Sequence, residues 1–231
     1  MPTLEEIQLF AKHHLKRRVV DHPAPDTQMG GVSLGYDAEV FASDMRALGD
    51  RFAVSTPITL AYRGAVHPVF DVEARDRDAP KRVLVLGGVH GNEQAGILAV
   101  PRILEAYDAS RQRYRGRMDL RVLAPVNPVG AAFFSRFNAD GYDVNRDFVR
   151  FETREARLVR DVISEYRPDI VVALHEGPQD ATFMFTNQHV ELPRAARLLR
   201  AMEKAGTELA RQDYFGRTLR PPGLAPMSRP Q

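Results

Sequence analysis

Apolar residues follow two different spacings along the chain, and segments with the two spacings alternate. Short apolar runs rich in Val, Ile and Leu predict strands, whereas apolar residues three or four positions apart predict amphipathic helices. The predicted strands cover residues 58–62, 66–72, 83–86, 118–124, 169–174 and 181–186. The predicted helices cover residues 3–20, 37–49, 94–107, 152–166 and 192–213. This alternation favours an α/β domain with a mixed, mostly parallel sheet and helices on both faces.

Glycine and proline mark the predicted boundaries of this domain. Residues 21–35 are rich in both and predict a linker, which separates an N-terminal segment of residues 1–35 from one domain of residues 36–231. A length of 231 residues fits one domain with a short appendage. The final stretch, residues 220–231, holds four prolines and predicts irregular structure.

Two of the predicted strands end next to residues that bind metals. The strand at 83–86 is followed by His90 and Glu93, and the strand at 169–174 is followed by His175. Two parallel strands deliver their following residues to the same edge of a sheet, and His and Glu are good zinc ligands. We therefore expect one zinc ion on His90, Glu93 and His175, with an open position for water. The alternative for the first two residues is a hydrogen-bonded pair at the start of a helix.

A second segment, residues 127–148, has little regular periodicity. Loops of this length inside a compact domain are usually functional. It carries Arg136 and Arg146, and a guanidinium binds carboxylates and oxyanions well. The alternative for Arg136 is a structural salt bridge. Tyr142, in the same segment, is a candidate for the wall of a binding pocket.

Composition narrows the class of protein. The chain is 44% hydrophobic and 27% charged, as expected of a soluble globular protein, and no apolar run approaches the roughly 20 residues that span a bilayer. The acidic N-terminus lacks the order of a secretory signal, so we expect a cytoplasmic protein without a membrane partner. A net charge of +2, with both signs interspersed, gives no reason to expect nucleic-acid binding.

The absence of cysteine limits the chemistry further. Without a thiol there is no thiolate ligand, no disulfide and no cysteine nucleophile, so only His and carboxylates can hold a metal. The glycines before and after His90 lack a following Lys-Ser or Lys-Thr, which argues against a phosphate-binding loop.

The order of these motifs resembles the zinc metallocarboxypeptidase superfamily, in which a strand, H-x-x-E, N-P-x-G, an Arg, N-R and a strand ending in His follow one another. The resemblance covers residues 36–186. The matching residues are His90-Gly91-Asn92-Glu93, Asn127-Pro128-Val129-Gly130, Arg136, Asn145-Arg146 and His175. The short spacer between Glu93 and His175 is more similar to the compact bacterial amidases and the succinylglutamate desuccinylase/aspartoacylase branch. The N-P-x-G and N-R loop is more similar to the peptidase branch.

The resemblance implies a role for each of these residues. Zinc on His90, Glu93 and His175 would polarise the scissile carbonyl, and Arg136 would stabilise the oxyanion that forms. Asn145 and Arg146 would hold the carboxylate of the substrate. The implied substrate is a peptide or an N-acyl amino acid with a free carboxylate.

One part of the family pattern is missing. The family's general base is a Glu on a strand well downstream of the third ligand, and the chain ends 56 residues after His175 (231 − 175). The acidic residues in this interval are Glu176, Asp180, Glu191, Glu203, Glu208 and Asp213. None lies on a strand of the expected kind, and Glu176 is the candidate substitute. We therefore expect that the last strands of the family fold are absent, that hydrolysis is weak and that the exposed sheet edge favours self-association.

Two functions follow as hypotheses. The first is a zinc hydrolase, of carboxypeptidase or N-acyl-amino-acid deacylase type, that cleaves a peptide or amide bond next to a free carboxylate. The second is a metal-binding, catalytically weak protein that recognises the same ligands without turning them over. The missing downstream Glu is the feature that separates them.

Overall fold

The computed structural model describes residues 7, 11, 35–76, 78–177, 179–186, 190–214 and 216–226. Nearly all of the predicted N-terminal helix and linker, residues 1–35, therefore lies outside the described residues. The described chain divides into two compact units, a larger one that ends at Glu176 and a smaller one that begins at Gly177. Each unit is described on its own.

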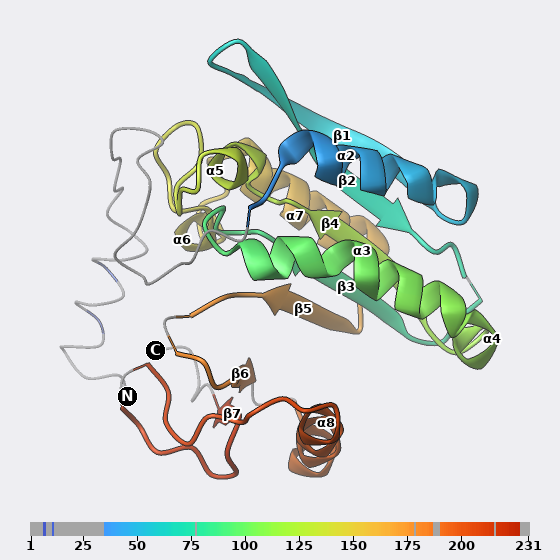
Figure 1. The fold of residues 1–231 in the computed structure, drawn as a ribbon, viewed down its shortest axis with the longest axis vertical. Helices are drawn as coiled ribbons and strands as arrows, with labels where there is room; N and C mark the ends of the chain where they lie inside the picture. Colours follow the sequence, from blue (N-terminus) through green and yellow to red (C-terminus); the bar gives the residue numbers. More distant parts are fainter. Residues whose placement is uncertain are drawn as a thin grey trace. The chain divides into compact units, whose positions relative to one another are not determined.

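The larger unit is built on a five-stranded sheet with the strand order β1-β2-β4-β3-β5 (Figure 1). Its strands are β1 (Ala53–Tyr62), β2 (Ala65–Glu73), β3 (Arg82–Gly87), β4 (Asp119–Ala124) and β5 (Ile170–Leu174). Strand β3 pairs in parallel with both β4 and β5, whereas the β1–β2 hairpin joins the sheet antiparallel to β4. The mixed sheet predicted from the alternation of strands and helices is confirmed.

Helices cover both faces of this sheet (Figure 1). On one face lie α2 (Ala38–Ala47), with the 3-10 turn η2 (Leu48–Asp50) after it, and α3 (Gln94–Ala109). On the other face lies α7 (Arg154–Tyr166). Successive residues of β3 serve the two faces in turn: Val85 joins the core under α2 and α3, whereas Leu84 and Leu86 pack with residues of α7. Full burial of one such side chain contributes roughly 1.5–3 kcal/mol.

Side-chain caps determine where two of these helices begin. The Asp37 carboxylate accepts hydrogen bonds from the backbone N–H groups of Glu39 and Val40, at 2.8 and 3.0 Å, which satisfies donors that the first turn of α2 leaves free. The Thr153 hydroxyl accepts a bond from Ala156 N at 3.2 Å and starts α7 in the same way.

Three short helices differ from the sequence-based prediction. No helix was predicted between residues 107 and 118, where the chain forms α4 (Arg111–Tyr114), and the long segment after β4 contains α5 (Pro128–Ala132) and α6 (Val144–Asp147). Helices of four or five residues complete little more than one turn, so they leave no readable period in the sequence. Strand β1 also begins earlier than predicted, at Ala53.

The smaller unit holds α8 (Leu192–Lys204) and a parallel pair of short strands, β6 (Met184–Thr186) and β7 (Leu224–Pro226). The prediction of one helix through residue 213 was wrong, because the chain turns at Gly206, whose φ of +88° suits glycine and ends the helix. The prediction of an irregular C-terminal stretch was also wrong at β7. No helix among the described residues is long and apolar enough to cross a membrane.

Strand β5 is more exposed than a buried strand should be. Its apolar sequence predicts burial, yet Ile170, Val171 and Val172 are 51%, 45% and 39% exposed. Among the described strands of the sheet, β5 lies at the edge and pairs only with β3, which accounts for this exposure. An exposed apolar edge is open to pairing with another chain. Self-association through this edge stays a prediction.

A buried ion pair crosses from β2 to β4. The Arg121 guanidinium donates to both carboxylate oxygens of Asp71, with Nε at 2.9 Å and an Nη at 2.6 Å, and both side chains are buried. Such a pair matters less for its own attraction than for the cost of leaving one charge buried without the other.

We expect Arg121→Met to lower the free energy of unfolding by about 3–5 kcal/mol, because it leaves the Asp71 carboxylate buried and unpaired. Urea denaturation of the full chain measures this loss. The control is Arg160→Met, which removes an exposed pair with Asp161 and should cost at most about 1 kcal/mol. Equal losses in the two variants would show that Asp71 does not depend on Arg121.

Candidate metal centre

The three predicted ligands lie together just beyond the carboxyl ends of two neighbouring strands, β3 and β5. Strands β3 and β5 are neighbours and in register there, with Gly87 opposite Leu174. The chain leaves β3 through a turn that carries His90 and reaches Glu93, the residue before α3, while His175 directly follows β5. One donor atom from each of the three residues lies within 4.8 Å of the others.

Glu93 bridges the two histidines. His90 Nδ1 lies 2.7 Å from one carboxylate oxygen of Glu93, and His175 Nδ1 lies 2.7 Å from the other. Burial alone would raise the pKa of Glu93, but the hydrogen bonds from His175 and His90 outweigh it and lower that pKa to about 2. The carboxylate of Glu93 is therefore ionised at neutral pH, and it faces Nδ1 of both imidazole rings.

Two glycines allow the turn that carries His90 to lie directly on α5. A Cβ on Gly91 would overlap the backbone of Gly130 and Ala131. A Cβ on Gly130 would in turn meet the carbonyl oxygens of Ser135 and Phe137 at 2.7 Å. Asn127 is the N-cap of α5: its side-chain oxygen accepts a hydrogen bond from Gly130 N at 2.9 Å and stabilises the start of this helix. The glycines of H-G-N-E and N-P-V-G thus bring the two motifs into backbone contact.

Arg136 reaches the centre through a residue that the sequence analysis missed, Asp143. One oxygen of Asp143 accepts from Nε and from an Nη of Arg136, both at 2.9 Å, and the other lies 3.2 Å from His90 Nε2. The remaining Nη of Arg136 lies 3.5 Å from His90 Nδ1. Asp143 stands two residues before Asn145, so a D-x-N-R pattern was the available signal.

The environment keeps Asp143 ionised. Its burial would raise the pKa of the carboxyl, but the hydrogen bond with His90 and the positive charges of Arg136 and Arg146 hold it well below the usual range. An ionised Asp143 fixes the orientation of the His90 ring, because it accepts a hydrogen from the nitrogen that faces away from Glu93.

The other predicted substrate residues lie on α6 or beside it. Asn145 and Arg146 are half-buried within this helix. Within the described part of the chain, Arg146 forms no ion pair, so its whole guanidinium remains available to an anion. Two of the three nitrogens of Arg136, by contrast, are engaged by Asp143. Tyr142 is only 6% exposed and offers little surface to a ligand.

Glu176, the candidate base, makes a different contact. One of its carboxylate oxygens accepts a hydrogen bond from Ala95 N at 3.1 Å, in the first turn of α3. This contact places a negative charge at the positive end of the helix, where it is stabilising. Glu176 does not belong to the group of donors that converge on one point.

The donor set fits a transition-metal ion such as zinc. Two imidazole nitrogens and one carboxylate oxygen are the ligands of many catalytic zinc sites, whereas calcium and magnesium prefer oxygen alone. The contact between His90 and Asp143 supplies the outer partner that metal-binding histidines usually have. His90, Glu93 and His175 could therefore hold such an ion without further ligands from the chain.

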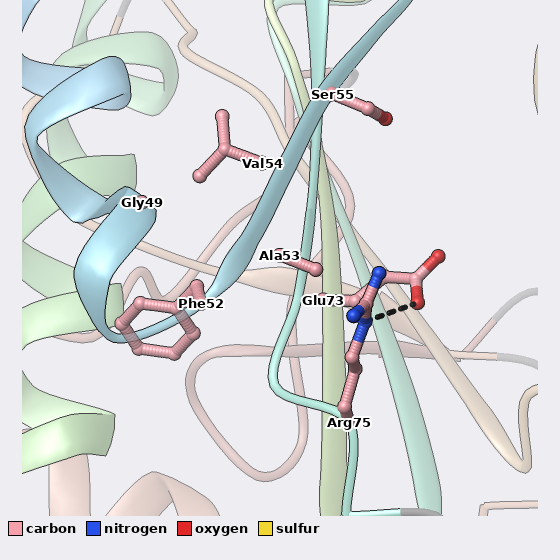
Figure 2. A pocket seen from close by; sticks show the side chains of 7 residues that line it. All are labelled: Gly49, Phe52, Ala53, Val54, Ser55, Glu73 and Arg75. Atoms are coloured by element: carbon pink, nitrogen blue, oxygen red, sulfur yellow. Dashed lines mark ion pairs between the residues drawn. The ribbon is translucent and has the colours of Figure 1, made fainter.

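A pocket elsewhere on the larger unit lies at the opposite end of the sheet (Figure 2). It is lined by Gly49, Phe52, Ala53, Val54, Ser55, Glu73 and Arg75. In the register of the sheet, Glu73 lies opposite Arg121, near the start of β4, whereas the segment with Arg136 leaves from the end of β4. Two of the lining residues, Glu73 and Arg75, form an ion pair at 3.9 Å. This pocket is separate from the metal centre.

Comparison with known proteins shows which proteins the chain is similar to. The catalytic domain of succinylglutamate desuccinylase/aspartoacylase matches residues 79–213. Carboxypeptidase 2 of Trichophyton tonsurans is 35% identical over 98 residues, which cover 41% of this chain and 18% of the fungal protein. The matched part of the chain thus spans less than a fifth of that relative.

Two solved structures share the fold. A metallo-carboxypeptidase from Burkholderia cenocepacia superposes with a TM-score of 0.62 at 16% identity, covering 84% of this chain and 54% of that one. A metallo-carboxypeptidase from Pseudomonas aeruginosa, in complex with (2-guanidinoethylmercapto)succinic acid, has a TM-score of 0.58 at 20% identity. It covers 73% of this chain and 48% of that one. Since the matching catalytic domain spans more than half of the sequence, the chain belongs to the succinylglutamate desuccinylase/aspartoacylase catalytic domain family.

Proposed function

We propose that this protein is a zinc-dependent hydrolase that acts on a peptide or amide bond next to a free carboxylate. The observation that carries the proposal is the convergence of His90, Glu93 and His175 at the carboxyl ends of β3 and β5. The segment that carries Arg136 and Arg146 lies beside them. The family and the fungal carboxypeptidase support hydrolysis. The succinic acid derivative bound by the Pseudomonas relative is a carboxylate ligand of that protein.

The chain's own residues would divide the work. A bound zinc ion polarises a carbonyl group and lowers the pKa of a water to about 7. Arg136 lies within 3.5 Å of His90, so its guanidinium is near enough to meet negative charge that develops on the carbonyl oxygen. Asp143 holds both His90 and Arg136 and would keep them oriented during the reaction.

Arg146 would recognise the substrate rather than activate it. Its side chain is half-buried and forms no ion pair within the residues that the structure describes. A carboxylate can therefore pair with it without displacing an internal partner, and Asn145 beside it would add a hydrogen-bond donor.

A second candidate function is recognition of the same ligands with little turnover. The contact that favours it is that of Glu176, whose carboxylate is bound to Ala95 N. Held at the start of α3, this carboxylate lies outside the group of donors that converge at the metal centre, so it is poorly placed to accept a proton there.

Metal content tests the centre directly. The full chain, purified without chelator and assayed by elemental analysis, should carry one zinc ion. We expect His175→Ala to lose the zinc ion. Asp143→Ala should bind it about 10–100-fold more weakly, because Asp143 orients the His90 ring. The control is His67→Ala, since His67 lies on β2 and is not among the converging donors. Equal zinc in His175→Ala and the unmodified chain would exclude His175 as a ligand.

The two arginines should affect different kinetic constants. With a substrate pair that ends in a carboxylate or in a carboxamide, we expect the unmodified chain to prefer the carboxylate and Arg146→Ala to lose that preference. Arg136→Ala should lower kcat by roughly 10²–10³-fold for both members of the pair, because it acts on developing charge. An unchanged preference in Arg146→Ala would show that the carboxylate binds elsewhere.

The role of Glu176 is testable with a matched control. Gln at this position keeps an acceptor for Ala95 N, so Glu176→Gln should fold normally. We expect Glu176→Gln and Glu208→Gln to hydrolyse as slowly as the unmodified chain, because the Glu176 carboxylate caps α3. A general base contributes typically about 10²–10⁴-fold. A loss of that size in Glu176→Gln alone would identify Glu176 as the base.

A further inference from the structure

Two fully buried polar side chains connect α7 to residues 136–146, here called the arginine segment because Arg136 and Arg146 stand at its ends. Asn138 is 0% exposed and Glu155, in the first turn of α7, is 1% exposed. The Asn138 amide donates to a carboxylate oxygen of Glu155 at 3.1 Å. Burying an amide and a carboxyl group is costly unless they are hydrogen-bonded, so each depends on the other.

The Asn138 side chain also stabilises the turn of residues 138–142 through hydrogen bonds. The side-chain oxygen of Asn138 accepts from Asp140 N at 3.1 Å and from Tyr142 N at 2.9 Å. The backbone N–H of Asn138 donates to Tyr142 O at 2.9 Å. One residue therefore ties both ends of the turn together and attaches it to α7.

This turn sets the distance between two site residues. Arg136 precedes it by two positions and Asp143 follows Tyr142 directly, and the two side chains are in contact at 2.9 Å. The contact needs both backbone positions to be held, since a salt bridge between mobile segments contributes little.

A second attachment lies at the last residue of α6, Asp147. The Asp147 carboxylate is fully buried and accepts from the backbone N–H and the hydroxyl of Thr153, both at 2.7 Å. Thr153 is the cap of α7. The segment that carries Asp143, Asn145 and Arg146 is thus fastened to the start of one helix at both of its ends.

We propose that Asn138 and Glu155 form a positioning pair, which holds the arginine segment in the geometry that binds the substrate carboxylate. The inference rests on the proposed function. Neither residue touches the substrate: they act through Arg136, Asp143 and Arg146. Burial raises the pKa of Glu155, against the hydrogen bonds from its own backbone N–H and from Asn138. The charged neighbours of Glu155 are Asp140 and Arg154, which act in opposite directions.

The experiment separates carboxylate binding from metal binding in the full, zinc-loaded chain. The probe is N-benzoylglycine, an N-acyl amino acid with a free carboxylate, and zinc affinity is measured by competition with a chelator. We expect Glu155→Ala to bind the probe roughly tenfold more weakly, because it leaves the Asn138 amide unsatisfied. Zinc affinity should fall less than probe affinity, since β3 and β5 place the three ligands and Asp143 orients only one of them, His90. Glu155→Gln, which can still accept from Asn138, should restore probe affinity.

Asn138→Asp provides a test that does not depend on truncating a side chain. It places two carboxyl groups at the position of the present hydrogen bond, and two adjacent carboxylates cannot both ionise without cost. The ratio of its probe affinity to that of the unmodified chain should therefore be low at neutral pH and rise towards one as the pH falls. Asp161→Ala, an exposed change on α7, is the control.

The outcomes are distinguishable. No carboxylate-dependent binding by the unmodified chain would overturn the proposed function and this inference with it. Normal probe affinity in Glu155→Ala, equal losses in Glu155→Ala and Glu155→Gln, or a pH-independent ratio for Asn138→Asp would overturn the inference alone.

Discussion

The backbone contact between the turn at Gly91 and helix α5 at Gly130 is the constraint on which the site depends. Two peptide segments can approach this closely only where neither carries a Cβ, and a Cβ on either residue would collide with backbone atoms. Asn92 N donates to Ser135 O at 3.1 Å and adds a hydrogen bond across the same contact. Because Ser135 immediately precedes Arg136, this contact places the arginine beside the histidine that the turn carries.

Asp143 makes the metal side and the arginine side of the site one unit. Its two oxygens are used separately, one by His90 and one by Arg136. A movement of this carboxylate would therefore rotate the imidazole and shift the guanidinium together. The arrangement also brings opposite charges together, since the carboxylate of Asp143 pairs with Arg136, and Arg146 is close enough to lower the pKa of Asp143.

The parts of the structure that sequence could predict are those with a local signal. The apolar run before Gly87 and the one before His175 gave two strands, and their parallel pairing brought the ligands together. The Asn138–Glu155 pair had no such signal, because its two residues lie 17 positions apart. The D-x-N-R pattern marks Asp143 but does not reveal that its partner is His90, 53 residues away. Periodicity alone did not predict the exposure of β5, since an apolar strand has the same pattern at the centre and at the edge of a sheet. The expectation of an exposed sheet edge came instead from the strands missing from the family pattern.

The position of β5 at the sheet edge gives the metal centre two unlike halves. The His90 side chain is 3% exposed and is held at both ring nitrogens, by Glu93 and Asp143. The His175 side chain is 32% exposed, and its Nδ1 is hydrogen-bonded to Glu93. The rigid half therefore comes from the interior strand β3, and the accessible half from the edge strand. In a hydrolase of the kind proposed, the reacting bond must enter from the accessible half, because Asp143 and the wall of α5 occupy the other. Substrate access would thus be set by the same strand pairing that brings the third ligand to the site.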